Sequence, residues 1–346
     1  MKFLISAAGT GGHVFPALEF GRECIKNDHE VLWIGTKTGI ENRVLPQKIE
    51  LLTIPMKGFR GKNLIFKITS LIGLIASIFK SIFYIQSNNI DYIVCFGGYI
   101  SLPVGLSAWI CRKPLFLHEQ NAIMGTSNKM LKKFSEIIFL GFSINEPISK
   151  KMMLVGNPIQ QLKSSSFINL NHEPIRIYIT GGSQGSEFIN KNIPIALNQL
   201  NIPLEVKHQS GNGKSLGIKE LYSSNISIEV EEFYDLPHEV ILWSDFIISR
   251  AGALSLSEAI SLRRGSLMIP LPSAIDNHQL FNAKYISDLD MGLIHTELES
   301  VESLSKKLNH IIEQKLYLKW SETESNLDHF QAAVTMLSSI LKFKNI

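Results

Sequence analysis

The residues best suited to chemistry stand near the N-terminus, in a glycine-rich stretch that contains a histidine. Residues 6–16 read SAAGTGGHVFP, so Gly9, Gly11 and Gly12 closely precede His13. An imidazole gains and loses a proton near neutral pH. Glycine inside a helix or strand costs roughly 0.5–1 kcal/mol relative to alanine. These glycines therefore predict a tight turn, or a place where a ligand approaches the backbone.

The elements on either side of this stretch are a predicted strand and a predicted helix. Residues 2–7 form a short apolar run, and residues 14–25 place apolar side chains at helical spacing. Backbone N–H groups at a helix N-terminus bind anions. The stretch is therefore predicted to be either an anion site or a plain strand-to-helix turn.

Four more polar stretches follow predicted strands. They are FGGYISLP at 96–103, HEQNA at 118–122, SRAGALSLSEA at 249–259 and PSAIDNHQLFNA at 272–283. Ligands of parallel sheets bind outside the carboxyl ends of the strands, and a scaffold without a ligand would not need polar side chains there. The four stretches are thus candidates for a binding site.

The stretch at 249–259 has the composition of a nucleotide site. Arg250 and the N–H groups after Gly252 suit a diphosphate, and the Glu258 carboxylate suits the two hydroxyls of a ribose. A Glu258 that forms a salt bridge or faces solvent is the alternative.

The chain as a whole has the pattern of an α/β protein with two doubly wound halves. Short apolar runs alternate with helical patterns, which predicts parallel sheets. Strands are expected near 2–7, 31–34, 92–95, 115–117 and 137–139, and again near 174–180, 204–207, 246–249 and 266–269. We expect a first domain at 1–157, a second at 158–326, and a C-terminal helix in 327–346 that packs back onto the first domain. Two such domains would face a cleft lined by both glycine loops.

Composition and motif spacing exclude several classes of protein. The 346 residues are 45% hydrophobic and 19% charged with a net charge of +3, which is ordinary for a folded protein and does not require nucleic acid. The first loop is not GxGxxG, no acidic residue ends the second strand, and HQSGNGKS at 208–215 has His208 where a P-loop needs glycine. The three cysteines form no CxxC, and there is no HExxH and no DxD at a strand end. We expect no metal and no cofactor. The apolar run at the N-terminus, MKFLIS, is too short for the apolar region of a signal peptide, so we expect a cytoplasmic protein.

Residues 64–86, LIFKITSLIGLIASIFKSIFYIQ, are the most apolar stretch of the chain. Lys67 and Lys80 bracket only about a dozen uncharged residues, fewer than the roughly 20 that span a bilayer. We expect a helix that does not cross a membrane. It is either a buried crossover helix or a helix whose exposed part enters the lipid interface.

Six motifs in order give the chain a family resemblance. GTGGHVFPA, FGGYISLP, HEQNA, GGSQGS, HQSG and SRAGALSLSEA occur as they do in the MurG family of bacterial peptidoglycan glycosyltransferases, and the resemblance covers nearly the whole chain. It implies the GT-B fold of two Rossmann-like domains and no metal. The implied reaction is an inverting transfer of N-acetylglucosamine from UDP-N-acetylglucosamine to the muramoyl 4-hydroxyl of undecaprenyl-diphosphoryl-muramoyl-pentapeptide (lipid I), which gives lipid II. The implied location is the cytoplasmic face of the inner membrane, with peripheral attachment and a possible place in a cell-wall synthesis complex.

The resemblance also implies roles for individual residues. His13 is the candidate base for the acceptor hydroxyl, or only orients the loop or the acceptor phosphates, and Glu119 is the other candidate base. Substrate-binding residues expected in the first domain are Thr10, Gly11, Gly12 and Asn121, with Gln160 after the GNP motif. Those expected in the second domain are Ser183, Tyr234 through its backbone to the uracil, Arg250, Ala253, Leu254, Ser255, Leu256, Ser257, Glu258 at the ribose and Gln279 at the sugar.

The chain departs from the family pattern at three places. Ala7 and Ala8 replace glycines, Gln160 replaces an arginine, and His278 precedes Gln279 where the family has paired glutamines. Gln160 can donate a hydrogen bond but cannot neutralise charge. The remaining alternatives are a related GT-B transferase with another lipid or small-molecule acceptor, a UDP-sugar epimerase of the same fold, and a nucleotide-sugar binding protein without turnover.

Overall fold

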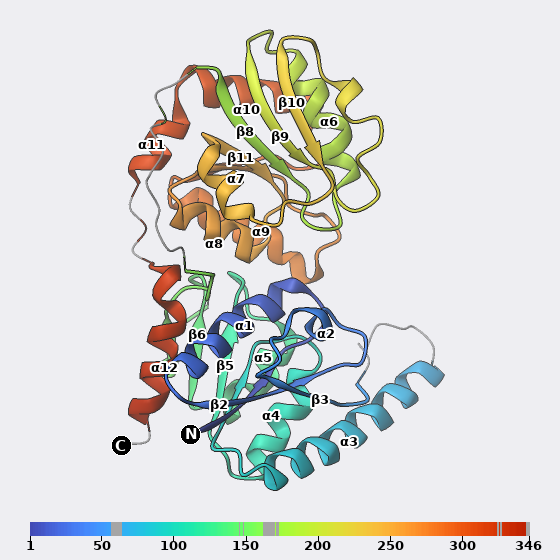
Figure 1. The fold of residues 1–346 in the computed structure, drawn as a ribbon, viewed down its shortest axis with the longest axis vertical. Coiled ribbons are helices and arrows are strands. Elements are labelled where there is room, and N and C mark those ends of the chain that lie inside the picture. Colours follow the sequence, from blue (N-terminus) through green and yellow to red (C-terminus); the bar gives the residue numbers. More distant parts are fainter. Residues whose placement is uncertain are drawn as a thin grey trace. The chain divides into compact units, whose positions relative to one another are not determined.

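The fold is taken from a computed structural model that describes residues 1–56, 64–144, 146–147, 149–161, 170, 173–323, 325 and 327–343, with the side chains of 64–68 left out. The chain divides into two compact units (Figure 1). The first comprises Met1–Gln161 and Leu327–Ile346, and the second Leu162–Asn326. The first unit thus extends four residues beyond the expected boundary at 157. Its C-terminal helix α12, Ala332–Phe343, belongs to it.

The first unit is built on a seven-stranded parallel sheet in the order β3-β2-β1-β4-β5-β6-β7. Its strands are β1 Lys2–Ser6, β2 Glu30–Gly35, β3 Glu50–Thr53, β4 Tyr92–Cys95, β5 Leu115–Glu119, β6 Ile137–Leu140 and β7 Met152–Leu154. Its helices are α1 Gly11–Lys26, α2 Glu41–Val44, α3 Leu64–Ser87, α4 Ser101–Ile110, α5 Thr126–Leu131 and α12, with short 3-10 turns at Lys132–Phe134 and His329–Gln331. The strand order reverses between β1 and β4, where doubly wound sheets bind ligands.

The second unit repeats this plan with a six-stranded parallel sheet in the order β10-β9-β8-β11-β12-β13. Its strands are β8 Ile175–Thr180, β9 Leu204–Gln209, β10 Ile226–Glu231, β11 Phe246–Ser249, β12 Ser266–Met268 and β13 Gly292–Ile294. Its helices are α6 Glu187–Asn198, α7 Pro237–Trp243, α8 Ala253–Ser261, α9 His278–Asp288, α10 Val301–Glu313 and α11 Leu316–Glu322, with 3-10 turns at Lys219–Leu221 and Ile275–Asn277. Here the order reverses between β8 and β11.

Alternate residues of the first sheet feed two cores, one on each face. Leu4 and Ile93 belong to one core, whereas Phe3 and Val94 belong to the other. Helix α12 adds Met336, Leu337 and Ile340 to the second core, beside α1. The C-terminal segment therefore packs onto the first unit by burying apolar side chains.

Helix α3 exposes five of its large apolar side chains, whereas Ile85 is fully buried in the core. Ser77 and Ser81 are fully buried, and the Ser107 hydroxyl of α4 donates to the carbonyl of Ile78 at 3.0 Å. The exposed side chains are Leu71, Ile72, Ile75, Phe79 and Phe83, of which Phe79 is 69% exposed. Thr69–Ser87 is long and apolar enough to cross a membrane by length and composition alone. Because these side chains are exposed, the prediction of a buried crossover helix is wrong. The expectation that α3 does not span a membrane stays a prediction.

Candidate active site

Helix α1 begins inside the glycine-rich stretch, earlier than predicted. Thr10 is its extended N-cap and makes no side-chain cap, and Gly11 and Gly12 form part of its first turn. Only Gly9, with φ +92°, needs the left-handed region that favours glycine. A Cβ on Gly12 would meet nothing closer than Thr10 Oγ1 at 3.9 Å. Packing does not demand glycine at position 12, and the first turn of α1 presents uncapped N–H groups.

The His13 ring rests on the loop that follows β4. A Cβ on Gly97 would lie 3.2 Å from His13 Cε1, and one on Gly98 would lie 3.4 Å from Cδ2. Both glycines have positive φ, +86° and +74°, so the loop folds closely over the imidazole. His13 Nδ1 lies 3.0 Å from Gln120 Oε1, and the side chain is half-buried. The GTGGH, FGGY and HEQNA motifs thus meet at the β1–β4 switch point.

Glu119 is buried and fully engaged. Its Oε1 accepts from the backbone N and Nδ2 of Asn121 at 3.2 and 3.1 Å. Its Oε2 accepts from Gly125 N at 2.8 Å and from Asn128 Nδ2 at 2.9 Å. Both oxygens therefore hold the loop that carries Asn121.

Gln120 and His118 complete this part of the site. Both belong to the HEQNA motif, but the sequence alone indicated no role for either. Gln120 Nε2 lies 2.9 Å from His118 Nδ1, and His118 Nε2 lies 3.1 Å from the carbonyl of Gly156. His118 is fully buried, and burial lowers its pKa to about 4. The ring is therefore neutral at physiological pH. Their position inside a polar motif was the one signal in the sequence.

In the second unit, α8 provides a second open helix N-terminus. Gly252 is its N-cap and gives no side-chain cap, so the first N–H groups of the helix face outward at the end of β11. The predicted binding residues Leu256 and Ser257 have fully buried side chains, and Leu256 N already donates to the Gly252 carbonyl at 3.0 Å. Ala253 is also buried, whereas Leu254 is half-buried and Ser255 is exposed. Side-chain contact with a ligand is thus open to the last two only.

Arg250 is held by four groups next to this helix, one of which is the carbonyl of Pro270 at 3.5 Å from Nη1. Its Nη2 donates to Ser186 Oγ at 2.7 Å, its Nη1 to the carbonyl of Ile269 at 3.1 Å, and Glu297 Oε1 lies 2.6 Å from Nη2. Ser186 ends the GGSQGS loop and caps α6 through Ile189 N. The guanidinium therefore ties three loops together, with its charge partly neutralised by Glu297.

Gln209 of the HQSG motif fixes the predicted uracil contact. Its Oε1 accepts from Tyr234 N and from the Tyr178 hydroxyl, each at 3.2 Å. Because Tyr234 N is used in this way, its carbonyl is the backbone group that remains for a base. Burial, above all, raises the pKa of Tyr178 to about 12, and the nearby Glu258 carboxylate adds to the shift. Half-buried Glu258 thus lies close to Tyr178.

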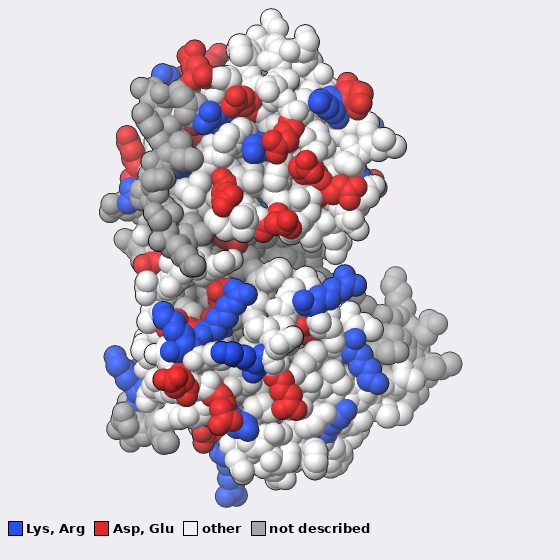
Figure 2. Space-filling view, viewed as in Figure 1, with Lys and Arg blue, Asp and Glu red and all other residues white. Residues whose placement is uncertain are grey.

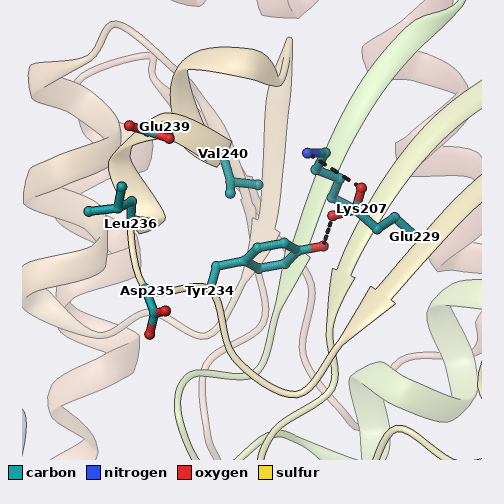
Figure 3. A pocket seen from close by; sticks show the side chains of 7 residues that line it. All are labelled: Lys207, Glu229, Tyr234, Asp235, Leu236, Glu239 and Val240. Carbon is teal, nitrogen blue, oxygen red and sulfur yellow. Dashed lines mark hydrogen bonds and ion pairs between the residues drawn. The ribbon is translucent and has the colours of Figure 1, made fainter.

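A cavity of about 430 Å³ lies in the second unit and touches the predicted site only at Tyr234 (Figure 3). The lining residues are Lys207, Glu229, Tyr234, Asp235, Leu236, Glu239 and Val240. The Tyr234 hydroxyl donates to Glu229 Oε1 at 2.9 Å, and Lys207 Nζ lies 3.6 Å from Glu229 Oε2. The hydrogen bond to Glu229 therefore holds the Tyr234 side chain at the wall of this cavity and helps to fix the position of the Tyr234 backbone.

The remaining predicted residues lie at loops and helix starts. Thr10, Gln160 and Ser183 are exposed. The carbonyl of Ser183 accepts from Asn212 N at 3.4 Å, and Gln279 Oε1 accepts from Leu271 N at 2.9 Å. Within the part of the chain that the structure describes, no group of three His, Cys, Asp or Glu side chains could hold a metal ion.

Comparison with known proteins agrees with this arrangement. The model of the glycosyltransferase family 28 N-terminal domain matches residues 3–140, and that of the family 28 C-terminal domain matches residues 176–337. A Coxiella burnetii protein named UDP-N-acetylglucosamine–N-acetylmuramyl-(pentapeptide) pyrophosphoryl-undecaprenol N-acetylglucosamine transferase is 34% identical over 310 residues, 87% of each chain. The protein of that name from Acinetobacter baumannii is 34% identical over 303 residues, 84% of this chain and 83% of its own.

Solved structures show the same fold. The crystal structure of Acinetobacter baumannii MurG superimposes with a TM-score of 0.84 at 29% identity and covers 99% of both chains. A glycosyltransferase of kitacinnamycin superimposes with a TM-score of 0.74 at 13% identity over 97% of this chain and 98% of its own, which is a likeness of fold alone. The two parallel-sheet units are thus the two Rossmann-like domains of a GT-B enzyme, and the chain belongs to glycosyltransferase family 28 and, within it, to the MurG family.

Proposed function

We infer that this protein transfers N-acetylglucosamine from UDP-N-acetylglucosamine to the muramoyl 4-hydroxyl of lipid I, with inversion, and so makes lipid II. The observation that carries this inference is the position of the six family motifs, which all follow or end strands of the two parallel sheets. In each unit this placement puts an open helix N-terminus at the carboxyl edge of the sheet. The first unit adds the imidazole of His13, and the second adds the carboxylate of Glu258, which we propose binds the ribose.

The second unit is proposed to hold the donor. The N-terminus of α8 and Arg250 face the diphosphate, and both favour the negative charge that grows on UDP as it leaves. Glu258 accepts from the ribose hydroxyls, and the Tyr234 carbonyl accepts from N3–H of uracil. Gln279, whose Oε1 is used by Leu271 N, donates through Nε2 to the sugar hydroxyls.

The first unit is proposed to supply the base. His13 Nε2 takes the proton of the acceptor hydroxyl as its oxygen attacks C1 of N-acetylglucosamine, and the bond from C1 to the UDP oxygen breaks. The sugar configuration inverts, UDP leaves, and His13 is left as an imidazolium. Glu119, the other candidate, spends both carboxylate oxygens on Asn121, Gly125 and Asn128 and so positions the loop.

We further propose that the first unit docks on the cytoplasmic face of the inner membrane, as a peripheral protein, where the lipid chain of the acceptor remains. Four large apolar side chains of α3, Leu71, Ile72, Phe79 and Phe83, are more than half exposed, and so are Trp109 and Met130. Lys80 of the same helix is also exposed. Lys133 Nζ lies 4.7 Å from the ring of Phe134, which contacts Trp109. In the view of Figure 2, Lys and Arg gather on the first unit, whereas Asp and Glu predominate on the second. Such a surface suits anionic lipid, and other enzymes of wall synthesis would meet the protein there.

Release of UDP separates this function from its alternatives. A transferase releases UDP from UDP-N-acetylglucosamine only when lipid I is present. A binding protein releases none with or without acceptor. An epimerase converts the UDP-sugar to another UDP-sugar in the absence of any acceptor, which sugar analysis of the nucleotide pool detects.

A further inference from the structure

A continuous chain of hydrogen bonds links His13 to a backbone carbonyl in the first unit. It runs from His13 Nδ1 to Gln120 Oε1 at 3.0 Å, from Gln120 Nε2 to His118 Nδ1 at 2.9 Å, and from His118 Nε2 to the Gly156 carbonyl at 3.1 Å. Gln120 is 2% exposed and His118 is fully buried. Every link is therefore shielded from water, apart from the half-buried His13.

The Gly156 carbonyl decides where the proton of His118 lies. A carbonyl oxygen can only accept, so His118 Nε2 must carry a proton to donate to it. A second proton on Nδ1 would need a charged ring in a buried site, which burial disfavours. His329, a second buried histidine close enough for its charge to act on that of His118, is neutral for the same reason, and its Nδ1 accepts from Asn157 N at 2.7 Å. His118 Nδ1 is thus an acceptor.

The orientation of the Gln120 amide follows from two acceptors on one side of it. Its Nε2 faces His118 Nδ1 and also the carbonyl of Phe96 at 3.0 Å. An amide oxygen facing those two groups would meet two acceptors, so the NH₂ group must point there. The amide oxygen is then fixed toward His13 Nδ1.

We propose that the Gly156 carbonyl, through His118 and Gln120, holds the proton of neutral His13 on Nδ1 and leaves the lone pair of Nε2 free for the acceptor hydroxyl. Gln120 and His118 are positioning residues in this scheme, since neither touches substrate. The inference rests on the proposed role of His13 as base. It adds which nitrogen acts, and which residues select it.

We call the chain of hydrogen bonds from His13 through Gln120 and His118 to Gly156 the relay. None of its groups is charged, which distinguishes it from a histidine paired with a carboxylate. The amide oxygen of Gln120 accepts a hydrogen bond but cannot compensate the charge of the imidazolium. Glu119, the adjacent carboxylate, is turned to Asn121 and Asn128 instead. The relay therefore sets the tautomer and ring orientation of His13 without supplying a charge.

The tautomers can be read directly by NMR. The whole protein, labelled with ¹⁵N-histidine, is examined at about pH 8.5, roughly two units above the ordinary pKa of histidine. Resonances of His13 and His118 are assigned by their loss in His13→Gln and His118→Phe. We expect the Nδ1–H tautomer at His13 and the Nε2–H tautomer at His118. A proton on Nε2 of His13 would overturn the proposal, and this result does not depend on any enzyme activity.

Kinetics test the contribution of Gln120. Gln120→Met keeps the length of the side chain and removes the amide, so nothing in the relay selects the tautomer of His13. We expect a mixture of His13 tautomers by NMR and a fall in kcat of roughly 10- to 100-fold, within the contribution of a general base, with the KM for UDP-N-acetylglucosamine unchanged. Gln331→Met, on an exposed glutamine of the same unit, is the matched control.

The two readouts separate the relay from the function on which it rests. If the wild type has the Nδ1–H tautomer but no transferase activity, the proposed function fails and the relay stands. If transfer occurs and Gln120→Met keeps the wild-type tautomer and kcat, the relay is wrong. Should Gln120→Met not fold, the wild-type tautomer of His13 alone decides.

Discussion

The guanidinium of Arg250 lies 2.6 Å from the carboxylate of Glu297, and the two side chains are 13% and 25% exposed. An anionic ligand at the α8 N-terminus would therefore meet an arginine whose charge is already partly balanced. Part of the free energy of binding a diphosphate would go into loosening this ion pair.

We expect Glu297→Gln to destabilise the free protein by about 1–3 kcal/mol, because Arg250 loses a charged partner. Saturating UDP should raise the Tm of this variant more than that of the wild type, since the diphosphate replaces the missing charge. Thermal unfolding with and without UDP measures both effects, with Glu313→Gln on the exposed side of α10 as control. An equal UDP-induced shift in variant and wild type would assign Arg250 to the structure of the loops alone.

The sheet centres could be predicted from the sequence, whereas the sheet edges could not. Nine strands were expected and found, and the four that were missed, β3, β7, β10 and β13, are the edge strands of the two sheets. Central parallel strands are buried on both faces and read as apolar runs. The edge strand β10 instead alternates in burial and reads ISIEVE, and β13 has only three residues. Because edge strands are partly exposed, they lack the continuous apolar run by which the central strands were predicted.

The motifs of the candidate site could be located from the sequence, but not the contacts that set their chemistry. Arg250 was expected at a diphosphate, and its pairing with Glu297, far along the chain, has no local signal. Gln120 and His118 belong to the HEQNA motif, yet their roles depend on the carbonyl of Gly156, which only the fold brings near. The sequence predicted helical spacing from residue 14, whereas α1 begins at Gly11. Glycine costs little at a helix start, where backbone N–H groups are left open.

Glu258→Ala should weaken UDP binding by about 1.5–3 kcal/mol, the range for hydrogen bonds to a charged group. Binding of 2′-deoxy-UDP provides the matched comparison, because it lacks one of the two hydroxyls. Calorimetry should show that the variant loses most of the wild-type preference for UDP over 2′-deoxy-UDP. A folded variant that keeps this preference would remove Glu258 from the ribose site.

Membrane binding should depend on both charge and apolar surface of the first unit. We expect Lys132→Glu with Lys133→Glu to reduce sedimentation with anionic vesicles, and added salt to reduce that of the wild type. Phe79→Ser should reduce binding at every salt concentration, since it removes exposed apolar surface.

The control for these vesicle experiments is Lys306→Glu with Lys319→Glu, which makes the same change of charge on exposed lysines of the second unit. Equal loss of sedimentation in the two double variants would mean that net charge, rather than this surface, governs binding.

His13→Ala should lower kcat by roughly 10²–10⁴-fold, the usual contribution of a general base. UDP affinity should hardly change, because the proposed nucleotide site lies in the second unit. The acid limb of the kcat profile against pH should flatten, since that limb reports protonation of the base. A variant with a raised acceptor KM and an intact acid limb would show that His13 only grips the acceptor, and Glu119 would then become the first candidate.

The most direct measurement is transfer of radiolabelled N-acetylglucosamine from UDP-N-acetylglucosamine to a short-chain lipid I analogue by the purified protein. We predict label in the lipid product, in a β-linkage to the muramoyl 4-oxygen, with one UDP released for each sugar transferred and no reaction without acceptor. Label that stays in the nucleotide pool, whether as unchanged donor or as another UDP-sugar, would contradict the assignment.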